Sequence, residues 1–245
     1  AATDQFRRQY GCPGLIRWAK AHPQLPLFTR ALVPCVSGQA PPPSHELLVQ
    51  WDVPVGTGTV TGEVFGDGSG LHVKIPGLRR CGWAVCQVLP GGGGTVVASF
   101  YGNLPGVAQD VPLAELFAFW QALRHCVPPM TFHTDCRFVA DGYLLGPTIT
   151  CGSSYPFAEL WQKVWRAVGD IGKEHLRVVW IKAHATLKDV QAGKLSDWQR
   201  KGNWHADSGA RSGAGLHPDV SGTLRLYETR AHAVELVARL AARLN

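Results

Sequence analysis

The stretch that most restricts the fold is residues 62–104, where three strand-like segments follow one another with only short connections. The segments are GEVFGDGSG, RCGWAVCQVL and TVVASFYGNL, and the glycine-rich turn PGGGG separates the second from the third. Strands that follow each other across short turns pair as an antiparallel meander. The core of this chain is therefore expected to begin with a sheet.

Helical and strand patterns alternate after this meander. The segment PLAELFAFWQALRHC has the apolar spacing of an amphipathic helix, and MTFHTD is typical of a short strand. Two helices are expected in CRFVADGYLLG and FAELWQKVWRAVGDIG, followed by a strand in LRVVWIKAH. A further helix, WQRKGNWHADSGARSGA, is expected to start near Asn203. This order predicts an α/β fold with one mixed sheet and helices packed on its faces.

The pattern divides the chain into three parts. Residues 1–60 are rich in proline and are expected to be an irregular extension that packs on the domain or on a partner. The domain itself is expected over residues 61–215, and residues 216–245 are expected to form a C-terminal amphipathic helix. Because both flanks carry apolar residues, a larger protein or ribonucleoprotein assembly is an expected partner.

Charge and cysteine content narrow the setting. The net charge is +6, which favours a polyanion such as nucleic acid. The seven cysteines are odd in number and include no C-x-x-C pair, which argues against a zinc site and a disulfide scaffold. A reducing intracellular compartment is expected: nucleus, cytoplasm, or an organelle after removal of a targeting segment. No run of about 18 apolar residues occurs, so no transmembrane segment is expected.

Candidate site residues lie at strand ends and on helices. Asp67 ends the first strand, Glu115 lies early in the first long helix, and Asp135 ends the fourth strand. His184 ends the last strand, and Asp207 lies on the following helix. In α/β sheets, ligands bind at strand ends, so these side chains are expected to point toward one edge.

Each of these residues also has an ordinary structural explanation. Asp67 could belong to a turn, and Glu115 could interact with a helix dipole. Asp135 could cap the helix that begins near Phe138, and Asp207 could pair with Arg211 on the surface. His184 could be a hydrogen-bonded structural histidine. Taken one at a time, the residues leave these alternatives open.

Taken together, the motifs VFGDGS, AELFAFWQAL, HTDCRFVADG, WIKAH and GNWHADSGARSG resemble the ribonuclease H family. The resemblance covers roughly residues 60–215 and keeps the order Asp, Glu, Asp, His, Asp. It implies an RNase H-like five-stranded sheet, with three antiparallel strands followed by parallel strands. In its details the sequence resembles RNase H domains of non-LTR retrotransposons, and this resemblance implies an origin in such an element.

The resemblance implies hydrolysis of the RNA strand of RNA/DNA hybrids by a metal-dependent endonuclease. Two Mg²⁺ (or Mn²⁺) ions, about 4 Å apart in such sites, are the implied cofactor. Asp67 would bridge both ions, with Glu115 and Asp135 on one ion and Asp207 on the other. His184 would shuttle a proton or help product leave. The implied nucleic-acid contacts are Gly68, Ser69, Lys182 and Asn203.

Two departures from the family pattern bear on function. The segment ITCGSSYP stands where relatives carry a basic helix that binds the hybrid, and the insert LKDVQAGKLSDWQRK lengthens the loop after His184. Two other hypotheses therefore stand beside the nuclease. One is a captured domain that serves as a non-catalytic structural subunit of a large assembly. The other is a nucleic-acid-binding module without cleavage.

Overall fold

The computed structural model describes residues 17, 21–22, 24, 40–53 and 58–244. The chain divides into two compact units, one spanning Pro42–Pro218 and the other made of Ala1–Pro41 with Asp219–Asn245. The first unit contains the whole of the domain expected over 61–215. In the second unit, helix α10 (Ser221–Leu244) lies in the segment expected to be the C-terminal helix. Most of the proline-rich extension lies outside the described residues.

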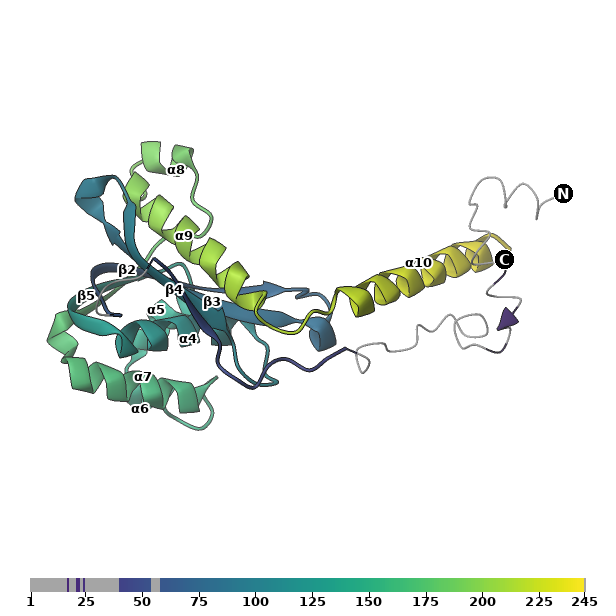
Figure 1. Cartoon of the computed structure of the whole chain (residues 1–245), viewed down its shortest axis with the longest axis horizontal. Helices are drawn as coiled ribbons and strands as arrows, with labels where there is room; N and C mark the ends of the chain where they lie inside the picture. Colours follow the sequence, from purple (N-terminus) through teal and green to yellow (C-terminus); the bar gives the residue numbers. More distant parts are fainter. Residues whose placement is uncertain (1–16, 18–20, 23, 25–39, 54–57, 245) are drawn as a thin grey trace. The chain divides into compact units, whose positions relative to one another are not determined.

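The first unit is built on a mixed sheet with strand order β1-β4-β3-β2-β5-β6 (Figure 1). β2 pairs antiparallel with β3, and β3 with β4, while β2–β5 and β5–β6 are parallel. The meander and the two parallel strands are as expected. The strands are β1 (Val49–Val53), β2 (Val60–Leu71), β3 (Arg80–Leu89), β4 (Thr95–Asn103), β5 (Cys126–Thr134) and β6 (Leu176–Trp180).

The sheet has one strand more than the five expected. β1 lies inside the segment expected to be irregular, and it pairs antiparallel with β4 at the edge of the sheet. Trp51 on β1 stacks on Phe100 of β4, with 4.4 Å between the ring centroids. The sequence VQWDV has alternating apolar residues, but the prolines before it concealed this short strand.

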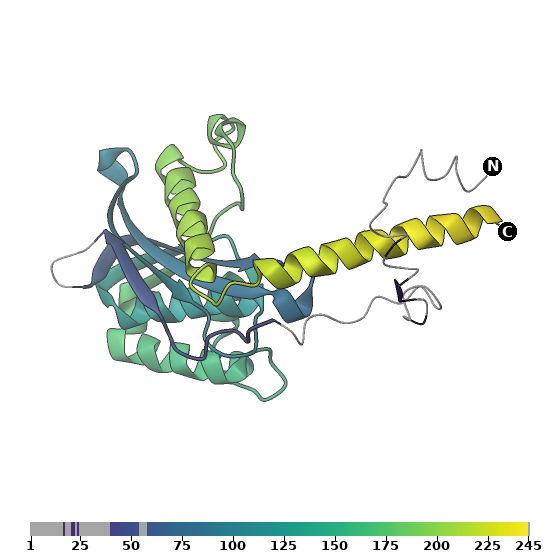
Figure 2. The same cartoon turned by 45° about the vertical axis from the view of Figure 1, so that its right-hand side comes forward.

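Helices cover both faces of the sheet (Figures 1 and 2). Helices α4 to α7 lie on one face, and α9 lies on the other. No described helix is both long enough and apolar enough to span a lipid bilayer. The helices of this unit are α4 (Val111–Arg124), α5 (Arg137–Leu145), α6 (Pro147–Thr150), α7 (Ala158–Ile171), α8 (Leu187–Gln191) and α9 (Asp197–Ala214), with short 3-10 turns at Pro76–Leu78, Pro90–Gly92 and Lys173–His175.

The central strands are apolar on both sides because both of their faces are buried. Val64 and Val85 belong to the large core that α4 and α7 cover. Their neighbours Phe65 and Cys86 point the other way, into a smaller core with Ala206 of α9. This arrangement explains why RCGWAVCQVL is an almost continuous apolar run.

Helix α9 begins at Asp197, six positions before the start expected near Asn203. A capping box sets this start: the Ser196 hydroxyl accepts a hydrogen bond from the Gln199 backbone N–H at 3.3 Å. The Gln199 side-chain oxygen accepts one from the Ser196 N–H at 2.9 Å. The expectation was wrong because polar residues fill the first turns of α9, so no apolar period marks them.

α9 packs at backbone distance on the strands through small residues. A Cβ atom added at Gly82 of β3 would overlap the backbone of Gly213 and Ala214 on α9. A Cβ added at Gly213 would overlap the Gly102 carbonyl of β4. Glycine at these positions lets the helix and the sheet touch directly, and this contact fixes the height of α9 above the strands.

We predict that Gly82→Ala destabilises the fold by roughly 1–3 kcal/mol, because the new methyl group meets rigid backbone instead of a movable side chain. The free energy of unfolding from urea titration measures the effect. The matched control is Gly169→Ala on the exposed surface of α7, where a Cβ meets nothing within 4 Å. That change should be neutral or stabilise by about 0.5–1 kcal/mol. Equal effects of the two substitutions would contradict the packing argument.

Candidate active site

Three carboxylates from three different elements meet at one point of the first unit. Asp67 lies on β2, Glu115 on α4, and Asp135 directly follows β5. One oxygen of each lies within 4.8 Å of the others. Asp67 and Glu115 are only 5% and 8% exposed. The structure thus brings together three of the four predicted metal ligands.

Gly68 brings the helix to the strand. A Cβ atom at Gly68 would overlap the backbone of Ala114 and Glu115, so β2 and the first turns of α4 lie in backbone contact. Burial raises the pKa of Asp67 and of Glu115, and the Gly68 backbone N–H offsets a small part of that rise. Gly68 is buried against the helix, and its expected contact with nucleic acid stays a prediction, as does that of the half-buried Ser69.

The electrostatics of this group are unfavourable without a cation. Burial raises the pKa of Asp67 well above its usual range, and the charges of Asp135 and Asp207 raise it further. Burial also raises the pKa of Glu115, followed by the charge of Asp67. Glu115 Oε2 is buried and accepts no hydrogen bond from the protein.

A divalent cation fits this donor set. Carboxylate oxygens are the ligands that Mg²⁺ prefers, and an unpartnered buried oxygen among them is free to coordinate. Among the residues that the structure describes, no other three His, Cys, Asp or Glu side chains come this close together. Asp67, Glu115 and Asp135 thus form a group that could hold a metal ion, as the sequence predicts.

Asp207 lies outside this group of three. Its carboxylate forms an ion pair with Arg211, one helical turn later on α9, at 3.1 Å. This is the surface pair that the sequence left open as an alternative. Asp207 is still close enough to raise the pKa of Asp67, while Arg211 lowers it. Its role as a metal ligand stays a prediction.

Asn203 has a role that the sequence did not reveal. It is buried on α9, and its Nδ2 donates a hydrogen bond to Asp135 Oδ2 at 2.9 Å. Its Oδ1 has no protein partner. Asn203 thus orients a carboxylate of the site, and its expected contact with nucleic acid stays a prediction. The sequence feature that could have revealed this role is the position of Asn203 between Gly202 and Ala206, on the face of α9 that carries small residues.

His184 lies outside the carboxylate group, in the exposed turn after β6. Its backbone is left-handed, with φ +46°. Lys182, two residues earlier, pairs with Asp189: 2.6 Å separate its Nζ from Asp189 Oδ1, and its side chain is 43% exposed. The catalytic role of His184 and the nucleic-acid role of Lys182 stay predictions.

Trp180, at the end of β6, is a further neighbour of the site that sequence reasoning missed. Its indole N–H donates to the backbone oxygen of Asp135 at 2.9 Å. The guanidinium of Arg137 lies over its ring, 3.6 Å from the centroid. Sequence reasoning missed Trp180 because a tryptophan in VVWIKAH is already expected from its preference for β-strands.

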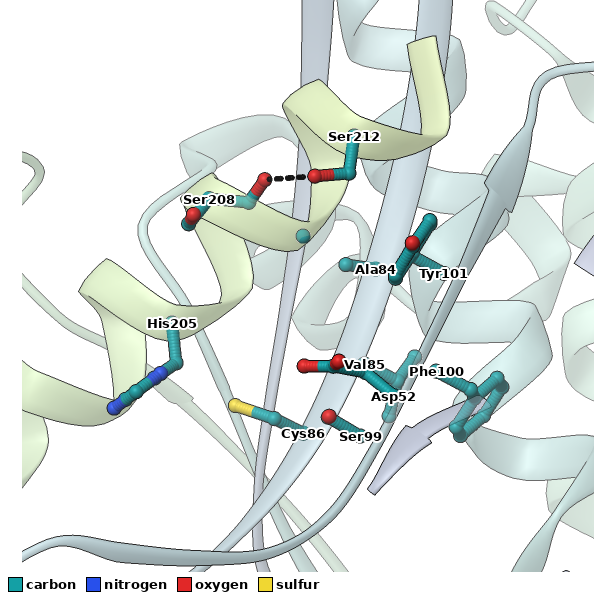
Figure 3. A pocket seen from close by; sticks show the side chains of 11 residues that line it. Asp52, Ala84, Val85, Cys86, Ser99, Phe100, Tyr101, His205, Ser208 and Ser212 are labelled. Atoms are coloured by element: carbon teal, nitrogen blue, oxygen red, sulfur yellow. Dashed lines mark hydrogen bonds between the residues drawn. The ribbon is translucent and has the colours of Figure 1, made fainter. Parts of the chain in front are cut away.

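Two hollows lie elsewhere in this unit. A hollow of about 130 Å³ lies beside α9, where Figure 3 shows polar side chains from the helix and the strands, among them Asp52, Ser99 and His205. These groups do not converge as the carboxylates do. A larger hollow of about 730 Å³ is lined partly by Cys151, Ser153 and Tyr155, within the segment ITCGSSYP. Lys163 also lines this hollow.

Comparisons with known proteins identify the fold of this chain. No family model and no curated protein matches the sequence. The chain is similar in structure to the protease-reverse transcriptase of prototype foamy virus, with TM-score 0.50 and 19% identity. That match covers 63% of this chain but only 21% of the viral protein.

Isolated RNase H domains are also similar. The solution structure of the PFV RNase H domain matches with TM-score 0.47 and 19% identity, over 63% of this chain and 94% of that domain. RNase H1 of Halobacterium salinarum matches with TM-score 0.39 and 18% identity, over 63% and 98%. The chain has the RNase H-like fold that its motifs indicated.

We predict that Glu115→Gln stabilises the metal-free protein at pH 7 by roughly 1–3 kcal/mol, the cost of an unsatisfied buried acceptor. Because the native pKa of Glu115 is raised, its charge opposes folding above the range where an unfolded glutamate titrates, about pH 4.3. The gain should therefore shrink as pH falls toward 4. Urea titrations across this pH range measure it, with Asp170→Asn on α7 as the control.

Mg²⁺ should reverse the order of stability of the wild-type protein and Glu115→Gln. A ligand that binds only the folded state raises its stability, so the wild-type protein should gain from Mg²⁺ while Glu115→Gln gains less. Equal Mg²⁺ stabilisation of the two proteins would argue against Glu115 as a ligand.

Proposed function

We propose that this chain, which has the RNase H-like fold, is a metal-dependent endonuclease that cleaves the RNA strand of RNA/DNA hybrids. One observation carries the proposal: buried carboxylates from β2, α4 and the end of β5 converge, and one of their oxygens is unpartnered. A structural domain has no need for such an arrangement, because it costs stability. An origin in a non-LTR retrotransposon rests on the sequence resemblance alone.

Asp67, Glu115 and Asp135 would hold the first divalent ion. When bound, such ions polarise the phosphate and make water a stronger nucleophile at neutral pH. A second ion would use Asp67 together with Asp207. Arg211 pairs with Asp207 Oδ2 at 3.1 Å, so this oxygen would have to leave the pair before it binds an ion, whereas Oδ1 takes no part in the pair. The pair is half exposed, and exposed pairs contribute only about 0–1 kcal/mol, so this exchange is inexpensive.

The surrounding residues hold the reacting groups in place. Asn203 holds the Asp135 carboxylate through its Nδ2, and the Trp180 indole holds the backbone of the same residue. The backbone contact between Gly68 of β2 and the first turns of α4 sets the position of Glu115. His184, exposed in the turn after β6, is the group available to move a proton or to assist departure of the product.

Nucleic-acid binding would use the surface of α9 near the site. Trp204 is 61% exposed and directly follows Asn203, which contacts Asp135. Arg200 precedes Trp204 by one helical turn, and Asp207 follows it by three residues, so all three share one side of α9. An exposed tryptophan can stack on a base, and Arg200 would meet a backbone phosphate after leaving its ion pair with Asp197, at 2.8 Å.

The first test is cleavage of a hybrid whose RNA strand is labelled, with and without Mg²⁺. We expect metal-dependent cleavage, reduced at least about 100-fold by Asp67→Asn, since loss of one preorganised electrostatic partner costs that much. Asn203→Ala should reduce it about 10–100-fold, as loss of a partner that orients a ligand does. Asp170→Asn is the matched control. A folded protein that leaves the RNA intact would instead favour the non-catalytic subunit or binding module.

Trp204→Ala should weaken binding of a hybrid about tenfold, since a stacked base contributes about 1–3 kcal/mol. Binding is measured in Ca²⁺ to prevent cleavage, by fluorescence anisotropy. Leu144→Ala on α5 is the control, because Leu144 is even more exposed, at 80%, and should not affect binding. Equal affinities of the two variants would remove Trp204 from the interface.

A further inference from the structure

The insert after His184 contains a buried carboxylate with an unusually complete set of partners. Asp189, on α8, is only 5% exposed. One of its oxygens, Oδ1, accepts from Lys182 Nζ at 2.6 Å and from Lys194 Nζ at 3.0 Å. The other, Oδ2, accepts from the Thr186 backbone N–H at 3.0 Å and from its hydroxyl at 2.9 Å. No part of the proposed reaction uses this group.

These contacts close an arch around His184. Lys182 lies two residues before the histidine and Thr186 two residues after it, and the same carboxylate binds both. We call residues 182–186 the His184 arch. The two ends of its five-residue span are therefore tied to one point, and only Ala183, His184 and Ala185 remain between the ties.

The backbone inside the arch needs such support. His184 has φ +46°, a left-handed conformation that costs free energy for a residue with a Cβ atom. Such conformations persist where surrounding contacts impose them, and they are frequent at functional sites. The two ties to Asp189 supply this restraint on either side of His184.

The insert supports Asp189 in turn. Thr186 and Asp189 form a capping box that starts α8, and the Lys194 backbone N–H donates to the Asp189 backbone oxygen at 3.0 Å. The insert thus folds back on itself and onto Lys182, next to the end of β6. Lys182, and then Thr186 and Lys194, lower the pKa of Asp189 well below its usual range, so the carboxylate stays ionised near neutral pH.

We infer that Asp189 is a positioning residue for His184: the insert holds the histidine in one place instead of lengthening a mobile loop. The role of His184 in cleavage rests on the proposed function, whereas the restraint on its position does not. Asp189 itself touches no reacting atom.

The first part of the test does not require activity. Asp189→Asn should speed amide hydrogen exchange within 182–189, above all at Thr186, and should move the ring signals of His184 in the NMR spectrum. The His184→Ala spectrum assigns those signals. Asp170→Asn on α7 is the matched control and should change neither. Unchanged exchange and an unchanged His184 signal in Asp189→Asn would overturn the inference.

The second part uses cleavage of the labelled hybrid. Asp189→Asn should lower kcat about 10–100-fold with little change in KM, because small misplacement of a catalytic group has effects of that size. In a His184→Ala background the same substitution should have little further effect, since the group it positions is gone. An equal loss in both backgrounds would mean a general defect and would overturn the inference.

Lys182→Gln covers the case in which Asp189→Asn does not fold. It removes only the tie on the β6 side and should change exchange and the His184 signal in the same direction. If the wild-type protein cleaves no hybrid, the proposed function fails, and exchange together with the NMR signal alone decides whether Asp189 positions His184.

Discussion

The backbone contact between β2 and α4 at Gly68 is the constraint on which the site depends. Because Gly68 has no side chain, the first turns of α4 lie directly on the strand and bring Glu115 to Asp67. On the other face, Gly82 lets α9 approach β3 in the same way. These two contacts set the distances from the sheet to both helices, and the carboxylates and Asn203 are placed by them.

The same closeness creates an electrostatic cost. Burial raises the pKa of both Asp67 and Glu115. The charges of Asp135 and Asp207 raise the pKa of Asp67 further, and the charge of Asp67 raises that of Glu115. Neighbouring polar groups offset this electrostatic cost only in part. Asn203 donates a hydrogen bond to Asp135, while Glu115 Oε2 has no hydrogen-bond partner. The three carboxylates therefore still lack enough neighbouring positive charge, and a divalent cation would supply it. The chemistry of the site and its instability without metal thus have one physical origin.

Much of the fold could be predicted, since apolar period and turn residues depend on local sequence. The meander and the alternation of helices and strands follow from it. Of the four acids that were expected to converge, the structure groups three. The strand β1 and the start of α9 at Asp197 could not be read in this way. Prolines precede the first, and a polar capping box rather than an apolar stripe marks the second.

The sequence by itself determined the central strands and the main helices, their order, and which of them carry acids. Only the tertiary structure decided where individual polar side chains are directed. It shows that Asn203 binds Asp135 and that Lys182 binds Asp189, partners that the sequence did not indicate. Asp207 stays with Arg211 instead of joining the other three acids. Periodicity reports which face of an element is buried, but the partner of a polar group depends on residues that only folding brings near.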